Sequence, residues 1–358
     1  MKQLQRDYKR IVIKIGSSLL CAQDAGSDCF TYPMEKIAEQ MLTLFKEGKE
    51  IVVVSSGAIA SGMRILKLKD RPKELAALQA VAAVGQHLLM SQYRSFFDRE
   101  GLNCAQILLI YDDFDDRKRY LNAKNTLMMV LKYKAIPIIN ENDSVSTEEI
   151  KFGDNDRLSA MVASLINADL LIILSDVDGL LDKDKRVISV IKEITPQIKA
   201  LACPTKRKTS VGGMITKIEA AKIAFDSGIP CVIANGRTKN IILDIARGPS
   251  MSGSWTAFLP KKGLKAREHW IAFVTKPKGT IIVDNGAKAA LLNKKSLLSV
   301  GIVAIEGDFK PADIVSIKDK QGEEFARGKV KLSSSQLDKV KGIRFSKEII
   351  HRNDMVML

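Results

Sequence analysis

Long hydrophobic runs are missing from this sequence. No stretch approaches the about 18 apolar residues that cross a membrane, and the opening MKQLQRDYKR leads into only a short apolar run before Gly16. We therefore expect a cytoplasmic protein with no membrane contact.

Cysteine is present but without a pattern. The chain has five cysteines with no CxxC spacing, namely Cys21, Cys29, Cys104, Cys203 and Cys231. Disulfide frameworks need paired cysteines and structural zinc sites need clustered ones, so neither is indicated. We expect most of these thiols to be buried.

The composition is that of a folded protein of more than one domain. The 358 residues are 46% hydrophobic, with no low-complexity segment and no internal repeat, so a sizeable core and two domains are expected. The formal net charge of +15 would suit an anionic partner, either nucleic acid or a phosphorylated small molecule. A basic surface can also serve solubility alone.

Short apolar runs alternate with helical patterns from Arg10 to about Phe258. The runs RIVIKIG, EIVVVSSG, CAQILLI, AIPIIN, DLLIILSD and PCVIANG are nearly all apolar, which is typical of strands buried on both faces. We predict an α/β fold, a mostly parallel sheet sandwiched by helices. In such sheets ligands bind at the carboxyl ends of the strands.

The pattern changes after PSMSGSWTAFLPKKGLKARE, a segment without clear periodicity. Beyond it come the strand patterns WIAFV, GTIIVD, ADIVSIKD and EFARGKV, interrupted by one helical pattern, NGAKAALLNKKS. We predict a boundary near residue 262, with a first domain over residues 1–262 and a small β-rich domain over residues 267–358. The second domain carries 17 Lys and Arg against 11 Asp and Glu, so the positive charge is shared between the domains.

Two lysines stand in unusual places. Lys14 lies inside the first strand pattern, just before the GSS of residues 16–18, whose backbone N–H groups could approach an anion. Lys217 lies in the first turn of the helix predicted after the glycines 212–213, where a cation is disfavoured by roughly 0.3–1 kcal/mol. An edge-strand lysine and a solvated helix-end lysine are the plain alternatives. The P-loop pattern GxxxxGK[ST] is absent.

Polar residues also follow the other strand patterns. Ser56 precedes a helix that begins near Ala58, either as part of a carboxylate site or as a plain N-cap. Ser175 and Asp176 end the fifth strand pattern, either as nucleotide contacts or as turn residues.

The block PIINENDSVSTEEIKFGDNDRLSA gathers carboxylates and amides at residues 140–143 and 154–156. Such residues are common caps where a helix starts. Beside the two lysines, however, Asp156 could orient two ammonium groups, and the neighbouring Asn and Asp side chains could receive an α-amino group.

These parts suit phosphoryl transfer, which depends mainly on positioning and on charge stabilisation by lysines, backbone amides and Mg²⁺. Histidine is scarce: the chain has only His87, His269 and His351. A hydroxyl acceptor needs a general base, whereas a carboxylate with a pKa of about 4 is already ionised at neutral pH. The scarcity of histidine favours a carboxylate acceptor.

Motifs in this order resemble the amino acid kinase family: IVIKIGSSLL, VVVSSGAIASGM, AAVGQ, the block at 137–160, LLIILSDVDGL and GGMITK. They span most of residues 10–258. SGAIASGM, INENDSV and GDND resemble most specifically the members that phosphorylate glutamate. The chain from about Arg267 resembles a PUA domain, a small β-barrel fold known in RNA-modifying enzymes.

The resemblance implies transfer of the ATP γ-phosphate to the side-chain carboxylate of L-glutamate, giving glutamyl 5-phosphate for proline biosynthesis. It implies three catalytic residues, which stabilise the migrating phosphoryl group or hold the lysines in place: Lys14, Lys217 and Asp156. It implies three glutamate contacts: Ser56, Asp143 and Asn155. It implies an ATP site made by Lys14, Ser175, Asp176, Val211, Gly212, Gly213, Met214, Ile215, Thr216 and Lys217.

Further implications concern ions and partners. Mg²⁺ is implied to arrive on the ATP phosphates, with no metal site in the protein itself. The family also implies a homo-oligomer and inhibition by proline. Ser210 and Val211 stand where the family usually has Gly-Thr, and the lost flexibility and the missing hydroxyl are expected to affect ATP affinity.

Two other functions stay open. One is an RNA-binding or regulatory protein that acts through the C-terminal domain. The other is a kinase of the same family with a different carboxylate acceptor.

Overall fold

The structure, a computed structural model, describes residues 7–20, 31–146, 155–202, 213–248, 254–260, 277–345 and 347–357. The chain divides into two compact units, one with nearly all residues up to 263 and the other with residues 264–358 and the short segment 114–116. The expected boundary near residue 262 and the strand pattern WIAFV fall within 261–276, outside the described residues. That boundary therefore stays a prediction.

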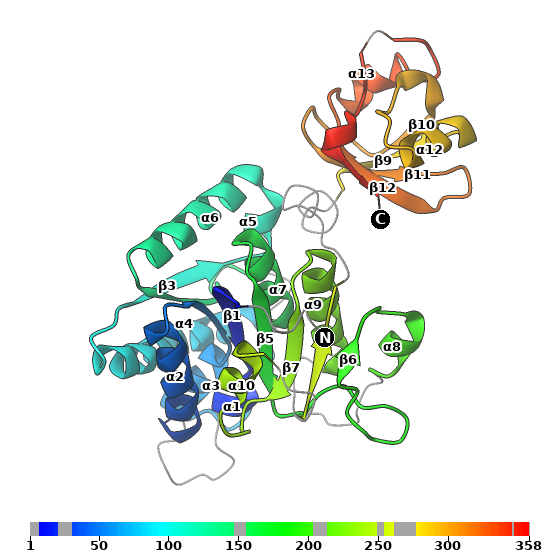
Figure 1. The fold of residues 1–358 in the computed structure, drawn as a ribbon. Helices are drawn as coiled ribbons and strands as arrows, with labels where there is room; N and C mark the ends of the chain where they lie inside the picture. The colour runs from blue at the N-terminus through cyan, green and yellow to red at the C-terminus, as the bar shows by residue number, and fades with distance from the viewer. Residues whose placement is uncertain are drawn as a thin grey trace. The chain divides into compact units, whose positions relative to one another are not determined.

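An eight-stranded sheet forms the centre of the first unit (Figure 1). The strand order in this sheet is β3-β4-β2-β1-β5-β7-β8-β6. Its strands are β1 (Arg10–Ile15), β2 (Glu50–Ser55), β3 (Cys104–Leu109), β4 (Ile136–Glu141), β5 (Leu170–Ser175), β6 (Val190–Ile191), β7 (Cys231–Asn235) and β8 (Trp255–Phe258). All neighbouring strands are parallel except β7 and β8, which confirms the mostly parallel sheet.

The described helices of the first unit lie around this sheet. They are α1 (Ser17–Leu20), α2 (Thr31–Lys46), α3 (Ala58–Ile65), α4 (Leu75–Asp98), α5 (Asp112–Asp115), α6 (Arg117–Lys132), α7 (Asn155–Leu165), α8 (Pro196–Ala200), α9 (Met214–Asp226) and α10 (Ile241–Ala246). None of the helices in the described part of the chain is both long enough and apolar enough to cross a bilayer.

Different helices cover the two faces of the sheet, and the alternation of side chains along β1 decides which of them the Lys14 side chain meets. Ile11, Ile13 and Ile15 belong to a core shared with side chains of α2, α4 and α10. Successive side chains of a strand point to opposite faces, so Val12 and Lys14 point to the other face. Helix α7 contacts β1, β2, β4 and β5, and α7 packs closely on α9. The Lys14 side chain therefore points toward α7 and α9.

The second unit contains a separate five-stranded sheet in the order β10-β9-β11-β12-β13. Its elements are β9 (Gly279–Val283), α12 (Asn285–Leu292), η2 (Ser299–Gly301), β10 (Ile302–Glu306), β11 (Ile314–Lys318), β12 (Glu324–Lys329), α13 (Ser334–Asp338), η3 (Arg352–Asp354) and β13 (Met355–Met357). This unit has its own buried core, which includes Ile281, Val315 and Ile350. The predicted small β-rich fold is confirmed.

Candidate active site

A cavity of about 630 Å³ lies at the carboxyl ends of β1, β2, β4, β5 and β7. Its lining includes Ser17 after β1, Ser56 after β2, Glu141 of β4, Ser175 of β5 and Asn235 of β7. The starts of α7 and α9 complete the wall. This is where parallel sheets bind ligands, and the volume is in the range of small-molecule sites.

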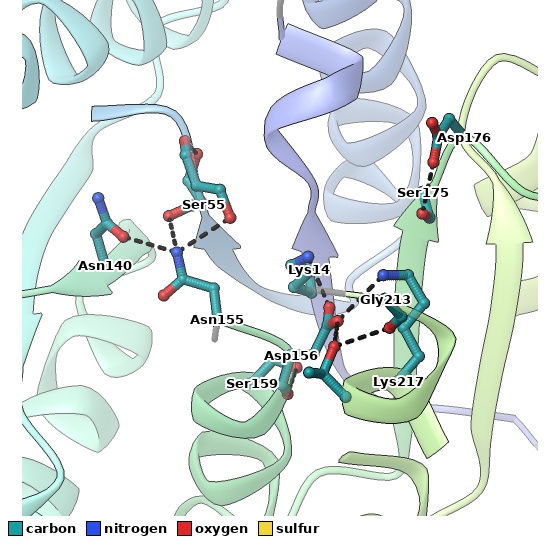
Figure 2. A network of polar contacts seen from close by, with 12 residues as sticks. Lys14, Ser55, Asn140, Asn155, Asp156, Ser159, Ser175, Asp176, Gly213 and Lys217 are labelled. Carbon is teal, nitrogen blue, oxygen red and sulfur yellow. Dashed lines mark hydrogen bonds and ion pairs between the residues drawn. The ribbon is translucent and has the colours of Figure 1, made fainter. Parts of the chain in front are cut away.

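Asp156 joins the two unusual lysines (Figure 2), and all three residues line this cavity. Nζ of Lys14 lies 2.6 Å from Oδ1 of Asp156, and Nζ of Lys217 lies 3.2 Å from Oδ2. The hydroxyl of Thr216 also donates to Oδ2, at 2.9 Å. Lys14 is 6%, Asp156 2% and Lys217 6% exposed, so the cluster is almost fully withdrawn from water.

The charges of this cluster depend on one another. Burial by itself would raise the pKa of Asp156, but the two ammonium groups and the hydrogen bonds to the carboxylate outweigh burial and lower that pKa to about 2. Asp156 is therefore ionised at neutral pH and neutralises one of the two cations. One positive charge remains for an anionic ligand.

The plain alternatives for the lysines do not hold. Lys14 is in β1, which lies between β2 and β5 and is not an edge strand. Lys217 is buried and paired, so it is not a solvated helix-end lysine.

Small side chains explain how α9 brings Lys217 to α7. Ala220, Ala221 and Ala224 on α9 are fully buried, and small residues let two helices approach closely. Helix α9 begins after Gly213, which makes no side-chain cap, so its first N–H groups are available to an anion.

A second polar network surrounds Asn155, the first residue of α7 (Figure 2). Its Nδ2 lies 3.1 Å from Oγ of Ser56 and 3.0 Å from Oδ1 of Asn140. Helix α3 begins after Gly57, which has φ 102° and no side-chain cap, so Ser56 does not act as the N-cap. The Ser56 hydroxyl instead faces Asn155 and the cavity.

Asp143 is an acid with an unusual environment. It lines the cavity near Glu141 and Arg71. Burial and the nearby Glu141 carboxylate raise the pKa of Asp143 to about 7, although the Arg71 guanidinium opposes the shift. Burial also raises the pKa of Glu141, against a hydrogen bond from Ser146. An ammonium group would be well placed between these acids.

On the other side of the lysines, short polar side chains end β5 and β7. The Ser175 hydroxyl donates to Oδ1 of Asp176 at 3.2 Å, and Asn235 donates to Oδ1 of Asp178 at 2.9 Å. Ser175, Asp176, Asp178 and Asn235 all line the cavity.

Not every residue of the expected ATP site lines the cavity. The ones that do are Lys14, Ser175, Asp176, Gly213, Met214 and Lys217. The Ile215 side chain is 46% exposed, and Thr216 contacts Asp156. Val211 and Gly212 lie outside the described residues, as does the departure at Ser210 and Val211.

Sequence reasoning missed several residues that line the cavity, and three of them have polar side chains: Arg71, Asp178 and Asn235. Asn235 ends a strand pattern, and Asp178 follows one closely, so the rule of strand ends could have found both. Arg71 lies in an irregular segment between α3 and α4, where no periodic signal marks it.

Within the described ranges, no group of three or more His, Cys, Asp and Glu side chains is placed to hold a metal ion.

A parallel sheet with paired lysines and helix starts at its carboxyl edge is the architecture of a phosphate-handling enzyme, and the chain belongs to the amino acid kinase family. It matches this family over residues 9–235 and the PUA domain over residues 279–352.

Relatives of nearly full length share one name. The chain is 45% identical over 368 residues to the glutamate 5-kinase of Caldanaerobacter subterraneus subsp. tengcongensis, with 98% of each chain covered. It is 44% identical over 356 residues to that of Methanosarcina mazei, with 96% of this chain and 91% of the relative covered. Among solved structures, carbamate kinase from Giardia is similar at 18% identity and a TM-score of 0.49, over 72% of this chain and all of the other.

Proposed function

We propose that this chain transfers the γ-phosphate of ATP to the side-chain carboxylate of L-glutamate, giving glutamyl 5-phosphate in proline biosynthesis. The observation that carries the proposal is the ion-paired cluster of Lys14, Asp156 and Lys217 in the lining of the cavity. The full-length glutamate 5-kinase relatives support the same activity over an RNA-binding role for the whole protein.

The strand order divides the cavity into two halves. Strand β1 with Lys14 lies between β2 and β4 on one side and β5 and β7 on the other. The β5 and β7 ends carry Ser175, Asp176 and Asn235, and the β2 and β4 ends are followed by Ser56 and Asp143. We assign the first side to the nucleotide, as the donor half, and the second to the amino acid, as the acceptor half.

The donor half has groups that fit ATP. Lys14, Lys217 and the uncapped start of α9 would bind the phosphates, while Ser175 and Asp176 would contact the nucleoside. When bound with ATP, Mg²⁺ would neutralise part of the phosphate charge.

The acceptor half has groups that fit a zwitterion. The carboxylates of Asp143 and Glu141 would attract the α-amino group. The start of α3, beside Ser56, would bind a carboxylate. Asn155 hydrogen-bonds Ser56 and would orient its hydroxyl.

The reaction itself needs little from the protein beyond position and charge. A side-chain carboxylate oxygen of glutamate bonds to the γ-phosphorus, and the bond between that phosphorus and the ADP oxygen breaks. The carboxylate is already ionised at neutral pH, so no general base is required. Lys14 and Lys217 stabilise the charge on the migrating group, and Asp156 fixes their positions.

An acceptor panel tests the proposal. The protein is incubated with ATP and L-glutamate, L-aspartate or N-acetylglutamate, and the acyl phosphate is trapped with hydroxylamine as the hydroxamate. When UMP is offered as the acceptor, the reaction is measured by the release of ADP, because UMP forms no acyl phosphate. We expect the highest kcat/KM with L-glutamate, and preference for any other acceptor would contradict the proposal.

The remaining expectations belong to the same proposal. A homo-oligomer and inhibition by proline stay predictions, and RNA binding by the second unit stays an open alternative.

A further inference from the structure

Helix α4 makes hydrogen bonds to residues that line the acceptor half of the cavity or lie close to it. Three of its polar side chains, Gln79, Gln86 and Tyr93, recur at intervals of seven residues and so lie on one face of the helix. Each makes a hydrogen bond to a residue that lines the cavity or lies close to one that does. None of the three lines the cavity itself.

Gln86 fixes the amide of Asn140. Nδ2 of Asn140 donates to Oε1 of Gln86 at 2.8 Å, which leaves Oδ1 of Asn140 to accept from Asn155 at 3.0 Å. If the Asn140 amide turned over, its NH₂ group would face the NH₂ group of Asn155. The backbone N–H of Glu141 also donates to Oδ1 of Asn140, at 2.9 Å, so Gln86 holds the nitrogen side of this amide while Glu141 and Asn155 hold its oxygen side.

Asn155 connects Asn140 to Ser56 by hydrogen bonds. Its Nδ2 lies 3.1 Å from Oγ of Ser56, at the start of α3. Asn155 is 7% exposed, and its Oδ1 has no hydrogen-bond partner among the described residues. That buried oxygen belongs to a residue of the cavity wall, where an incoming N–H or O–H group would satisfy it.

Tyr93 contacts Ser55, which does not itself line the cavity. Its hydroxyl donates to Oγ of Ser55 at 2.9 Å, and Ser55 immediately precedes Ser56. Both residues of this contact are fully buried. Burial raises the pKa of Tyr93 further, so its hydroxyl remains a donor.

Gln79 acts at the other end of the face. Its Nε2 donates to the carbonyl oxygen of Ser146 at 3.2 Å, and the Ser146 hydroxyl donates to Glu141 at 2.7 Å. These three hydrogen bonds of α4 join it to residues in or near the acceptor half, and none of them involves Ser175, Asp176 or Lys217.

We propose that α4 positions the acceptor half through Gln86 and Tyr93, so that these residues determine the affinity for the amino acid and not for ATP. This inference rests on the proposed assignment of the two halves. Gln86 and Tyr93 are positioning residues, since Gln86 contacts the lining residue Asn140, Tyr93 contacts Ser55 next to Ser56, and neither lines the cavity itself.

The test compares KM for the two substrates in Gln86→Met, which keeps the length of the side chain and removes the oxygen acceptor. We expect KM for L-glutamate to rise about tenfold, as the loss of one buried hydrogen bond to the wall suggests, with KM for ATP changed less than about twofold. Gln92→Met is the matched control, because Gln92 is on the same helix and no hydrogen bond among the described residues joins its side chain to the cavity.

A double variant separates positioning from a general loss of packing. If Gln86 acts through Asn140, Gln86→Met should add little to the KM change already produced by Asn140→Leu. Unchanged KM for glutamate, equal rises for glutamate and ATP, or full additivity would overturn the inference. If Gln86→Met does not fold, Tyr93→Phe is used, with the same expected split and the same contradicting results.

The wild-type acceptor panel keeps the two proposals apart. If wild-type protein prefers another acceptor, the proposed substrate is wrong, and the KM split is then measured with that acceptor. A split that is still confined to the acceptor supports the role of α4.

Discussion

Nζ of Lys14 lies 2.6 Å from Oδ1 of Asp156, with both side chains almost fully buried. The second oxygen of the same carboxylate receives Lys217. Removing one partner of a buried ion pair is costly because it leaves the other charge uncompensated. Here the loss of Asp156 would leave two like charges facing each other.

Asp156→Asn should therefore destabilise the protein by about 3–5 kcal/mol and also greatly reduce kcat. Urea unfolding and hydroxamate formation measure the two effects. Asp98→Asn is the control, since Asp98 is exposed at the end of α4 and pairs only with Arg94 among the ion pairs described. Equal stability of the two variants would contradict a structural role for Asp156.

The stabilisation by Asp156 should depend on pH. Its pKa is lowered in the folded protein, from an ordinary 3.8 to about 2. A carboxyl with a depressed folded pKa stabilises fully above its unfolded pKa and loses that contribution as pH falls through the folded pKa. The stability difference between wild type and Asp156→Asn should therefore shrink between about pH 5 and pH 2 in urea titrations. A constant difference over that window would argue against the charged form.

We expect the binding of L-glutamate to depend on pH because of the raised pKa of Asp143. Its pKa is raised to about 7, first by burial and then by Glu141, so it is largely protonated at lower pH. An ammonium group needs the ionised form, and KM for L-glutamate should fall as pH rises through about 7. Arg71→Gln removes the cation that lowers this pKa and should move the midpoint to higher pH. A profile of kcat/KM that is flat from about pH 5 to pH 9, or the same in both proteins, would contradict this role.

Asp143→Ala should remove the pH-dependent step and raise KM for glutamate, while KM for ATP stays nearly constant. Steady-state kinetics with each substrate varied in turn measure this split. Ser144→Ala is the neighbouring control, since Ser144 is exposed and does not line the cavity. An unchanged KM for glutamate would leave Asp143 a loop residue only.

Gly85 lies where α4 packs tightly on α3, so we expect a larger residue there to reduce stability. A Cβ at Gly85 would lie 1.8 Å from the carbonyl oxygen of Ala58, in the first turn of α3. Gly85→Ala should force α3 and α4 apart and cost about 1–3 kcal/mol of stability, as overpacking does. Thermal unfolding measures the loss, with Ala83→Ser at an exposed position of α4 as the control. Wild-type stability in Gly85→Ala would show that the helices adjust freely.

Much of the fold could be predicted because buried parallel strands leave a strong signal. β1, β2, β4 and β5 are almost entirely buried, and their sequences are correspondingly apolar. β8 was missed because Trp255–Phe258 lies in a stretch rich in Gly, Ser and Pro, and its pairing with β7 is a tertiary contact.

The site was predictable to the extent that strand ends define it. Ser56 and Ser175 follow directly from that rule, whereas Lys14 was marked by its unusual place inside an apolar strand. The sequence could not decide whether Ser56 caps α3, because the backbone of Gly57 and the partner Asn155 decide it. Nor could it reveal the role of α4, since Gln86 meets Asn140 only through the packing of the helix on the sheet.

The most direct test of the lysine cluster is kcat of Lys217→Ala under saturating ATP and L-glutamate. Removing a charge that stabilises the transition state should lower kcat by about 10²–10³, with a cooperative unfolding transition retained. Lys222→Ala on the same helix is the control, because Lys222 is partly exposed and pairs with Asp226. A loss of kcat in Lys217→Ala but not in Lys222→Ala is the predicted result, and a wild-type kcat in folded Lys217→Ala would contradict the mechanism.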